Sequence, residues 1–271
     1  MIEILSSVCN VNTCFLKTLI DIMSQASSSD TLNPTPAIIK QVVFKFSKEG
    51  IEVTSDHNRR VFASASIFNT FFCEYEYKED FPICIGISLE ILKSCFKHVH
   101  KQDTVKMTIS KEEFATFPNV IDFIINENKG FSIKFNIVQN IECDEQTSFE
   151  KIVSVSSTRV SNIFKELGNI RQNVSMSLAT DQIKLSSNII NLAESWVSFP
   201  IPRRTKTNQI DTKSEYFKFL SKMAVFDERC DIFMETDTMN VVFETNIKNY
   251  RESKTKIFGR IRIGITNNVK A

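Results

Sequence analysis

Apolar residues recur at intervals of three and four positions in four separate segments of the chain. In one of them, Leu89, Leu92, Phe96 and Val99 fall on a single face of a helical projection. This spacing is typical of an amphipathic helix that buries one side. The pattern predicts helices at about 12–24, 88–101, 157–168 and 213–223.

Short runs of alternating apolar and polar residues follow each predicted helix, and polar turns join them. The first pair is 41–47 and 51–55, on either side of the turn Lys48-Glu49-Gly50. Alternation with a period of two indicates strands with one buried face, and tight polar turns indicate antiparallel hairpins. The later strands fall at 104–110, 120–125, 131–138, 174–179, 182–187, 230–236 and 240–247. One helix followed by antiparallel strands therefore forms a unit that occurs four times.

Two of these units precede residue 140 and two follow residue 149. The stretch between them, QNIECDEQTS at 139–148, is polar and acidic and has no helical spacing. The 271 residues of the chain suit two domains of roughly 130 residues each. The sequence therefore predicts an α+β fold of two similar domains, each with antiparallel β-sheets and two helices on one face. We expect an N-terminal domain at 1–138, an interdomain connector at 139–148 and a C-terminal domain at 149–271.

The apolar and cysteine content indicates an intracellular protein that does not span a membrane. No run approaches the roughly 20 uninterrupted apolar residues of a spanning helix. The first residues contain no basic region, so we expect no signal peptide. The seven cysteines are odd in number and include no CxxC pair, which argues against a disulfide framework and a zinc site. The single tryptophan, Trp196, is expected in the core or at a sheet edge.

Little in the sequence favours an enzyme, a cofactor or a metal. Only six glycines are present, and none of them forms a dinucleotide-binding or phosphate-binding loop. His98 and His100 could be taken as a metal-binding pair, but a helix would direct them to different faces. Lys97 and Lys101 would also repel a cation there. We therefore expect a protein that is not an enzyme and that binds no cofactor or metal.

Positive charge is concentrated on the predicted helices. The whole chain has a net charge of +1, whereas the four helical segments together carry +5, so the rest of the chain carries −4. Lys93, Lys97 and Lys101 are spaced by four residues, as are Lys218 and Lys222, and each set forms a stripe opposite an apolar face. If the helices share one side of the sheets, their lysines form a surface suited to phosphate oxygens and to sequence-independent binding. The alternative is that these lysines are simply solvated.

Four segments resemble the sliding clamps of the proliferating cell nuclear antigen (PCNA) family. They are FKFSKEGIEVTSDHNRRVFASASI (44–67), IGISLEILKSCFKHVHKQDTVKMTIS (85–110), FEKIVSVSSTRVSNIFKELGNI (149–170) and SEYFKFLSKM (214–223). The resemblance implies a subunit of two similar domains, three of which close head to tail into a ring. It implies that helices line the bore around double-stranded DNA and that sheets form the outer wall. The implied partners are a DNA polymerase and other clamp-binding proteins.

The resemblance assigns basic bore positions to Lys17, Lys97, Lys165 and Lys222. Spacing along the helices adds Lys93, Lys101, Arg159, Arg171 and Lys218 to this DNA-binding set. Asn162 and Thr18 stand at two bore positions that are basic in relatives. We therefore expect a bore that is less strongly charged than is usual for the family.

A ring of this kind needs an edge strand at each end of the subunit, because pairing satisfies the exposed backbone groups. The resemblance places these edges at 130–135 and 187–193. The contact candidates are Phe131, Ile133, Ile189 and Leu192. Ordinary core alternation explains the same residues equally well.

Family members also bind a short peptide of a partner protein in an apolar pocket beneath the connector. The matching positions are Arg60, Val61, Ile141, Met239, Ile263 and Ile265. Three features depart from the family pattern. The connector lacks a Leu-Gly-Ile-Pro run, Ile265-Thr266-Asn267 replaces a Pro-Lys pair, and Arg59 with Arg60 enters the loop. We therefore expect a pocket with altered peptide specificity.

Two other readings remain open. The chain could be one subunit of a heterotrimeric checkpoint-type clamp, or a viral processivity factor that acts as a monomer or dimer. It could also be a β-rich structural or scaffold protein. A clamp would act in the nucleus or at a viral replication site.

Overall fold

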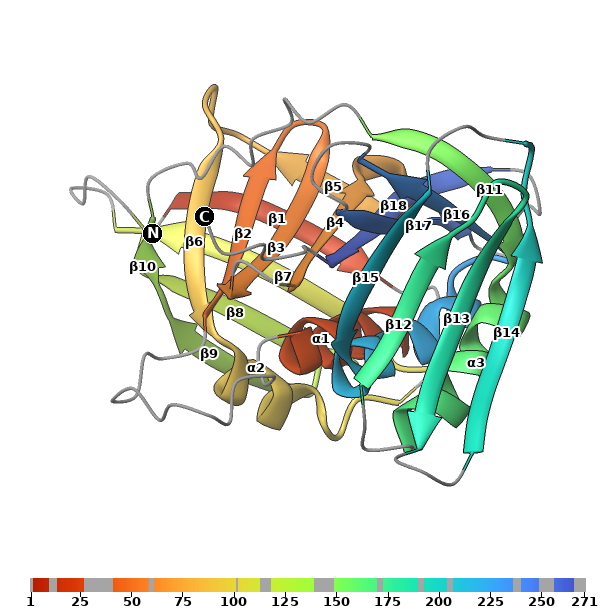
Figure 1. Ribbon diagram of the computed structural model, residues 1–271. Helices are drawn as coiled ribbons and strands as arrows, with labels where there is room; N and C mark the ends of the chain where they lie inside the picture. The colour runs from red at the N-terminus through yellow and green to blue at the C-terminus, as the bar shows by residue number, and fades with distance from the viewer. Residues whose placement is uncertain are drawn as a thin grey trace.

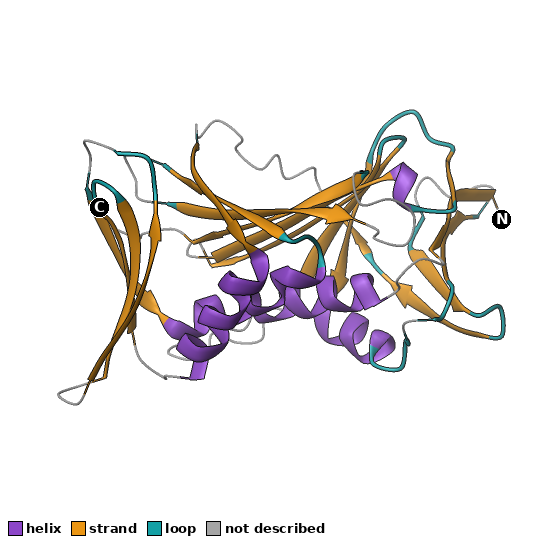
Figure 2. Cartoon of the chain, turned by 90° about the vertical axis from the view of Figure 1, so that its right-hand side faces the viewer, coloured by secondary structure: helices purple, strands orange, loops and turns teal. Residues whose placement is uncertain are grey.

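A computed structural model of the chain shows an antiparallel β protein with its helices collected on one side. It describes residues 2–9, 14–26, 41–58, 61–100, 102–112, 118–138, 149–169, 173–189, 193–203, 207–235, 240–248 and 256–265. The helices form a row along one face of a broad layer of strands, and further strands close both ends of this layer (Figure 2). This arrangement confirms the α+β class predicted from the sequence.

The elements follow the order strand, helix, strands in both halves of the chain (Figure 1). The N-terminal half contains β1 (Ile2–Cys9), α1 (Cys14–Ala26), β2 (Gln41–Ser47), β3 (Gly50–Asn58), β4 (Val61–Phe68), η1 (Asn69–Phe71), β5 (Glu74–Tyr77), β6 (Ile83–Ser88), α2 (Leu89–Phe96), β7 (Val105–Lys111), β8 (Val120–Ile125), β9 (Lys129–Lys134) and β10 (Asn136–Ile137). The C-terminal half contains β11 (Glu150–Ser156), α3 (Ser157–Asn169), β12 (Asn173–Leu178), β13 (Gln182–Ile189), β14 (Ala193–Pro200), β15 (Asn208–Lys213), η2 (Ser214–Val225), β16 (Arg229–Met234), β17 (Val241–Lys248) and β18 (Ile257–Ile265). The elements η1 and η2 are 3₁₀ helices.

The repeated unit consists of a leading strand, a helix and a meander of three strands. The four units are β1-α1-β2-β3-β4, β6-α2-β7-β8-β9, β11-α3-β12-β13-β14 and β15-η2-β16-β17-β18. In each half, the leading strand of one unit pairs with the first meander strand of the other unit. Thus β1 pairs with β7 and β6 with β2, while β11 pairs with β16 and β15 with β12. This exchange interlocks the two units of each half.

Three antiparallel sheets result from these pairings. The largest has nine strands in the order β10-β6-β2-β3-β4-β18-β17-β16-β11, and it runs across both halves of the chain. The junction between the halves is the pairing of β4 with β18, in which Val61 lies opposite Ile265. The other two sheets have the orders β5-β1-β7-β8-β9 and β14-β13-β12-β15. Within the described chain, β9 and β14 each end a sheet, and they lie at opposite ends of the molecule (Figure 1).

Alternate burial along the strands explains why the helices gather on one face. Along β2, Val42, Phe44 and Phe46 are buried, and the residues between them are half-buried. Apolar side chains therefore point to one side of the sheet, where the apolar faces of the helices cover them. Helix α1 contacts α2 on one side and η2 on the other, and η2 also packs against α3.

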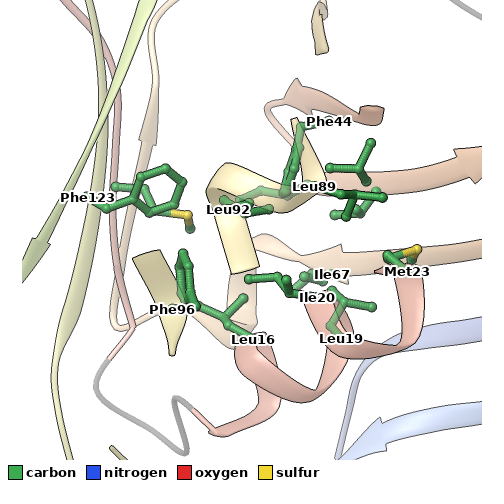
Figure 3. Close-up of a pocket in the computed structure, with 14 residues that line it drawn as sticks. Leu16, Leu19, Ile20, Met23, Phe44, Ile67, Leu89, Leu92, Phe96 and Phe123 are labelled. Carbon is green, nitrogen blue, oxygen red and sulfur yellow. The ribbon is translucent and has the colours of Figure 1, made fainter. Parts of the chain in front are cut away.

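A small cavity lies inside the N-terminal half, between α1, α2 and the sheets (Figure 3). Its wall is entirely apolar and includes Leu16, Leu92, Phe96 and Phe123. The free volume is about 20 Å³, comparable to the space that one water molecule occupies. A buried water needs polar partners, and this wall offers none. The cavity is therefore a packing gap in the core and does not suit a ligand.

Candidate nucleic-acid interface

Three lysines stand out on the solvent side of the helix row. Lys93 on α2, Lys97 just after it and Lys165 on α3 are all exposed. Lys93 Nζ lies 3.5 Å from Ser24 Oγ of α1. None of the three forms an ion pair with another described residue. Their ammonium groups are therefore available to an anion that approaches the helices.

Lys17 has a different role, because its ammonium group is already engaged. Nζ donates to the carbonyl oxygen of Lys97 at 2.9 Å and to that of Val99 at 3.4 Å. These carbonyls follow the last turn of α2, where the helix leaves unpaired acceptors and the negative end of its dipole. Lys17 thus links α1 to the end of α2 and fixes the turn that carries Lys97.

Lys222 is also engaged, through an ion pair between two helices. Its Nζ lies 2.9 Å from Asp21 Oδ2, and the two side chains are 29% and 32% exposed. The pair connects η2 of the C-terminal half to α1 of the N-terminal half. Because the two charges cancel, Lys222 adds little positive potential to the helix row. The residues are 201 positions apart in sequence, so helical spacing could not have revealed this contact.

Arg159 sits at the start of α3 and faces the edge of a sheet. Its Nη2 donates to the carbonyl oxygen of Ser198 at 3.3 Å, and its guanidinium carbon lies 4.9 Å from the ring centre of Phe199. Both partners belong to β14. Arg159 therefore braces α3 against this strand, and it remains exposed.

The structure does not describe the side chains of the remaining predicted DNA-binding residues. Lys101 and Arg171 lie outside the described residues. Lys218 lies in η2, but its side chain is not described. Asn162 is exposed on α3 and Thr18 is half-buried on α1, as neutral residues on the same row. The described part of the row is therefore only weakly basic.

The first predicted subunit edge coincides with an edge strand, β9. Phe131 is half-buried and stacks on Phe123, with 5.0 Å between ring centres, and Ile133 is buried. Both side chains point to the core side of the sheet. Their contact role between subunits stays a prediction.

The second predicted edge, at 187–193, needs correction. The strand that ends this sheet is β14, which begins at Ala193. Ile189 lies on β13, an interior strand with β12 on one side and β14 on the other, and it pairs with Ala193. Leu192 lies outside the described residues. On the true edge strand, Trp196 is the large exposed apolar residue, with 61% of its surface exposed.

The predicted peptide-pocket residues also need correction, because those that are described lie in the core. Val61, Ile263 and Ile265 are each at most 2% exposed and face the helix side of the nine-stranded sheet. On the opposite face, Phe62 lies beside Gly264 on the neighbouring strand. The side chains of these three residues are therefore not exposed, and the place where a partner peptide binds stays a prediction. The other three predicted residues, Arg60, Ile141 and Met239, lie outside the described residues. The predicted connector at 139–148 also lies outside them.

The turn before β9 is held by a polar network at Asp103. The backbone N–H of His100 donates to Asp103 Oδ2 at 2.7 Å, and Asn126 Nδ2 donates to Asp103 Oδ1 at 2.8 Å. These hydrogen bonds, led by the one from His100, lower the pKa of the Asp103 carboxyl group from its ordinary value. Asn126 itself has φ of 50°, a left-handed conformation that asparagine tolerates in turns.

Metal chemistry finds no support among the described side chains. His98 and His100 are exposed. Across the described ranges, no three His, Cys, Asp or Glu side chains come together in a group that could hold a metal ion. Among the described helices, none has the length and apolar character required to cross a bilayer.

This combination of interlocked antiparallel units with all main helices on one face is the fold of a DNA sliding clamp. The chain aligns with PCNA from Entamoeba histolytica over 98% of its own length and 99% of that chain, with a TM-score of 0.71 and 14% identity. It aligns with a chain of the PCNA2–PCNA3 complex from Sulfolobus tokodaii over 97% of its length and 99% of that chain, with a TM-score of 0.72 and 14% identity. The expected resemblance to PCNA is thus confirmed as a likeness of fold.

A viral protein is similar in sequence. The uncharacterized protein 436R of Invertebrate iridescent virus 6 is 29% identical over 269 residues, which cover 92% of this chain and 88% of that protein. No protein-family model matches the sequence.

Proposed function

We propose that the chain is a subunit of a DNA sliding clamp, which closes around double-stranded DNA and tethers a DNA polymerase and other clamp-binding proteins to it. The observation that carries this proposal is the single helix row, with Lys93, Lys97 and Lys165 exposed on its solvent side. The likeness to PCNA over nearly the whole chain supports the same function.

Enclosure explains how a weakly basic surface can suffice. A ring holds DNA by its topology, so it needs no contacts to base edges. Each lysine contributes a phosphate contact that salt weakens and that does not depend on sequence. A small number of such contacts is enough to keep the duplex centred, and it still allows the duplex to slide.

The positions of the two edge strands support the proposal that copies of the chain close into a ring. Because β9 and β14 lie at opposite ends of the molecule (Figure 1), a head-to-tail contact between them can repeat from copy to copy. We propose that three copies close the ring. In each copy, domains at 1–138 and 149–271 flank a connector at 139–148, and partner proteins bind beneath this connector.

The proposed activity is tethering and involves no catalysis, cofactor or metal. A polymerase held by the ring has a raised effective concentration at the template, and its processivity increases accordingly. The site of action would be the nucleus or a viral replication site.

A topological retention assay tests the proposal without a loading factor or a known polymerase. A linear duplex is fixed to a bead at one end, the protein is allowed to thread over the free end, and that end is then blocked. The bead is washed at about 1 M salt, where the Debye length of roughly 3 Å screens lysine–phosphate contacts. We expect the protein to stay bound and to leave when a restriction enzyme cuts the duplex. Release in the wash would contradict enclosure.

Matched variants test the role of the helix row in the same assay. Lys93→Glu, Lys97→Glu and Lys165→Glu together should reduce threading at low salt. The control carries the same change of charge at Lys48, Lys78 and Arg260, which are exposed away from the helices. An equal loss in both triple variants would show that the helix row has no special role.

A ring of different subunits is a second candidate. The Sulfolobus tokodaii structure is a complex of two different chains, PCNA2 and PCNA3. Sedimentation of the purified chain separates the two possibilities, because a homotrimer has three times the chain mass and a subunit of a mixed ring does not reach it alone.

A further inference from the structure

The positive stripe on α2 extends beyond the last residue of the helix. The helix ends at Phe96, but the backbone at Lys97 keeps a helical conformation, with φ of −54° and ψ of −37°. Lys97 therefore follows Lys93 by about one turn and lies on the same face. This alignment of the two exposed lysines depends on a residue at the very end of the helical backbone, where helices fray.

Lys17 holds this end of α2 from the neighbouring helix. The last carbonyl groups of a helix have no partner within it. Here, Lys17 Nζ donates to the carbonyl oxygen of Lys97 at 2.9 Å and to that of Val99 at 3.4 Å. A cation is favoured at this position, because it meets the negative end of the helix dipole. With its carbonyl oxygen bound, Lys97 is held in the helical conformation that keeps it in line with Lys93.

Val99 fixes the other side of the same turn. Its side chain is buried, with 2% exposed, and its N–H donates to the carbonyl oxygen of Phe96 at 3.1 Å. The core thus holds the Val99 side chain while Lys17 binds its carbonyl oxygen. Lys97 therefore lies between the regular part of α2 and an anchored residue, and only its side chain extends into solvent.

The C-terminal half uses a residue that cannot reach DNA for a similar contact. Ser161 of α3 is 3% exposed. Its Oγ lies 3.5 Å from the carbonyl oxygen of Leu220 and accepts from the backbone N–H of Ala224 at 3.3 Å, both near the end of η2. In each half, a side chain of the first helix thus binds the backbone at the end of the second. The contact serves helix placement in one half, which favours the same role for Lys17 in the other.

Polar contacts of this kind join every pair of neighbouring helices in the row. Lys17 joins α1 to α2, the ion pair of Asp21 with Lys222 joins α1 to η2, and Ser161 joins η2 to α3. Two of the lysines that the family resemblance assigns to the bore, Lys17 and Lys222, therefore bind other helices. The exposed lysines of the row are held in place by these contacts.

We propose that Lys17 acts on DNA through Lys97. Lys17 stays bound to the two carbonyl oxygens when the ring encloses a duplex, and it makes no phosphate contact of its own. It is a positioning residue, which keeps the Lys97 ammonium group where a phosphate can reach it. Lys97 itself forms no ion pair with another described residue. This inference rests on the proposed clamp function.

The salt dependence of binding to a short duplex tests the coupling between the two lysines. Lys17→Met, Lys97→Met and the double variant are compared, because methionine removes the charge and keeps an unbranched side chain of similar helix propensity. Each phosphate contact contributes about 0.9 to the slope of log affinity against log salt. We expect each single variant to flatten the slope equally, and the double variant to flatten it no further than either.

Lys165→Met is the matched control, because it removes the same charge from the same row on a different helix, α3. Combined with Lys17→Met, it should flatten the slope by the sum of the two single effects. If Lys17→Met and Lys97→Met also add up, Lys17 contacts phosphate directly and the inference is wrong. It is equally wrong if Lys17→Met leaves the slope unchanged.

Amide hydrogen exchange without DNA separates this inference from the proposed function. Lys17→Met should accelerate exchange at the N–H of Val99, whereas Lys97→Met should not, because it leaves the backbone contact intact. Unchanged exchange in Lys17→Met would show that Lys17 does not hold the turn, and the inference would fail while the ring could stand. Accelerated exchange with no salt-dependent DNA binding by the unsubstituted protein would instead refute the clamp function, and with it any role of Lys17 on DNA.

Discussion

The same corner, between a helix and the strand that follows it, occurs in both halves of the chain with very different exposure to solvent. In the N-terminal half, Asp103 binds the Asn126 side chain at the surface. In the C-terminal half, Asp227 is 2% exposed and pairs with Lys248 at 3.0 Å, next to Asn246. The repeated topology thus sets where the carboxylate lies, while burial sets how strongly the fold depends on it.

The physical difference between the two corners is desolvation. A carboxylate at the surface exchanges protein hydrogen bonds for water at little cost. A buried carboxylate and its ammonium partner have both lost water, so removal of one leaves the other without compensation. A third contact, Asp21 with Lys222, lies between these extremes, because both side chains are about one-third exposed. The three contacts form a graded series.

The largest effect is expected at the buried corner. Asp227→Ala removes the partner of Lys248, whose side chain is 20% exposed. We expect a loss of about 3 kcal/mol in the free energy of unfolding, since buried ion pairs that lose one member are destabilised on this scale. Denaturant unfolding followed by circular dichroism measures it.

Two further variants separate burial from the contact itself. Asp227→Asn keeps an acceptor for the backbone N–H of Glu228, which Asp227 Oδ1 binds at 2.7 Å, so it should cost less than Asp227→Ala. Asp103→Ala breaks the equivalent corner at the surface and should cost less again. Equal losses at Asp103 and Asp227 would show that burial does not govern these corners.

Much of the architecture was predictable from apolar spacing, because each helix buries one face. The segments 157–168 and 213–223 correspond to α3 at Ser157–Asn169 and η2 at Ser214–Val225. The leading strands were not predicted. In β6, five consecutive residues are buried, so the alternation that identifies a strand with one solvated face is absent.

The site was less predictable than the fold, because its charges depend on contacts between distant segments. Spacing identifies Lys222 as part of a basic stripe, but it cannot show that Asp21 neutralises it. Likewise, a family match locates Ile263 on the last strand but does not show that its side chain faces the core. Trp196 could be expected at an edge, yet only the strand order identifies β14 as that edge.

An intermediate effect is expected at the helix row. Asp21→Asn should lower the free energy of unfolding by only about 0.2–1 kcal/mol, as is usual for exposed ion pairs. The same change frees Lys222 and removes a negative charge beside the proposed DNA path. DNA binding should therefore become tighter, and the slope of log affinity against log salt should steepen by about 0.9, the value of one extra phosphate contact.

Salt-dependent binding to a short duplex measures this effect, with unfolding in parallel. Glu90→Gln is a matched control, because Glu90 is exposed on α2 and forms no ion pair with another described residue. It removes the same charge without releasing a lysine. If both variants steepen the slope equally, the gain comes from net charge alone and Lys222 remains unavailable to DNA.

The smallest effect is expected at the exposed corner and appears as a pH dependence. Hydrogen bonds from the His100 backbone and the Asn126 side chain lower the pKa of Asp103 in the folded state. Because the folded pKa lies below the unfolded one, of about 3.9, the contribution to stability is fully present above the unfolded pKa. It is lost as the pH falls through the folded pKa. Nuclear magnetic resonance titration of the Asp103 carboxyl group should show this lowered value. Asn126→Ala should move the pKa back towards its ordinary value, and an unchanged titration would show that the backbone N–H of His100 alone holds the carboxylate.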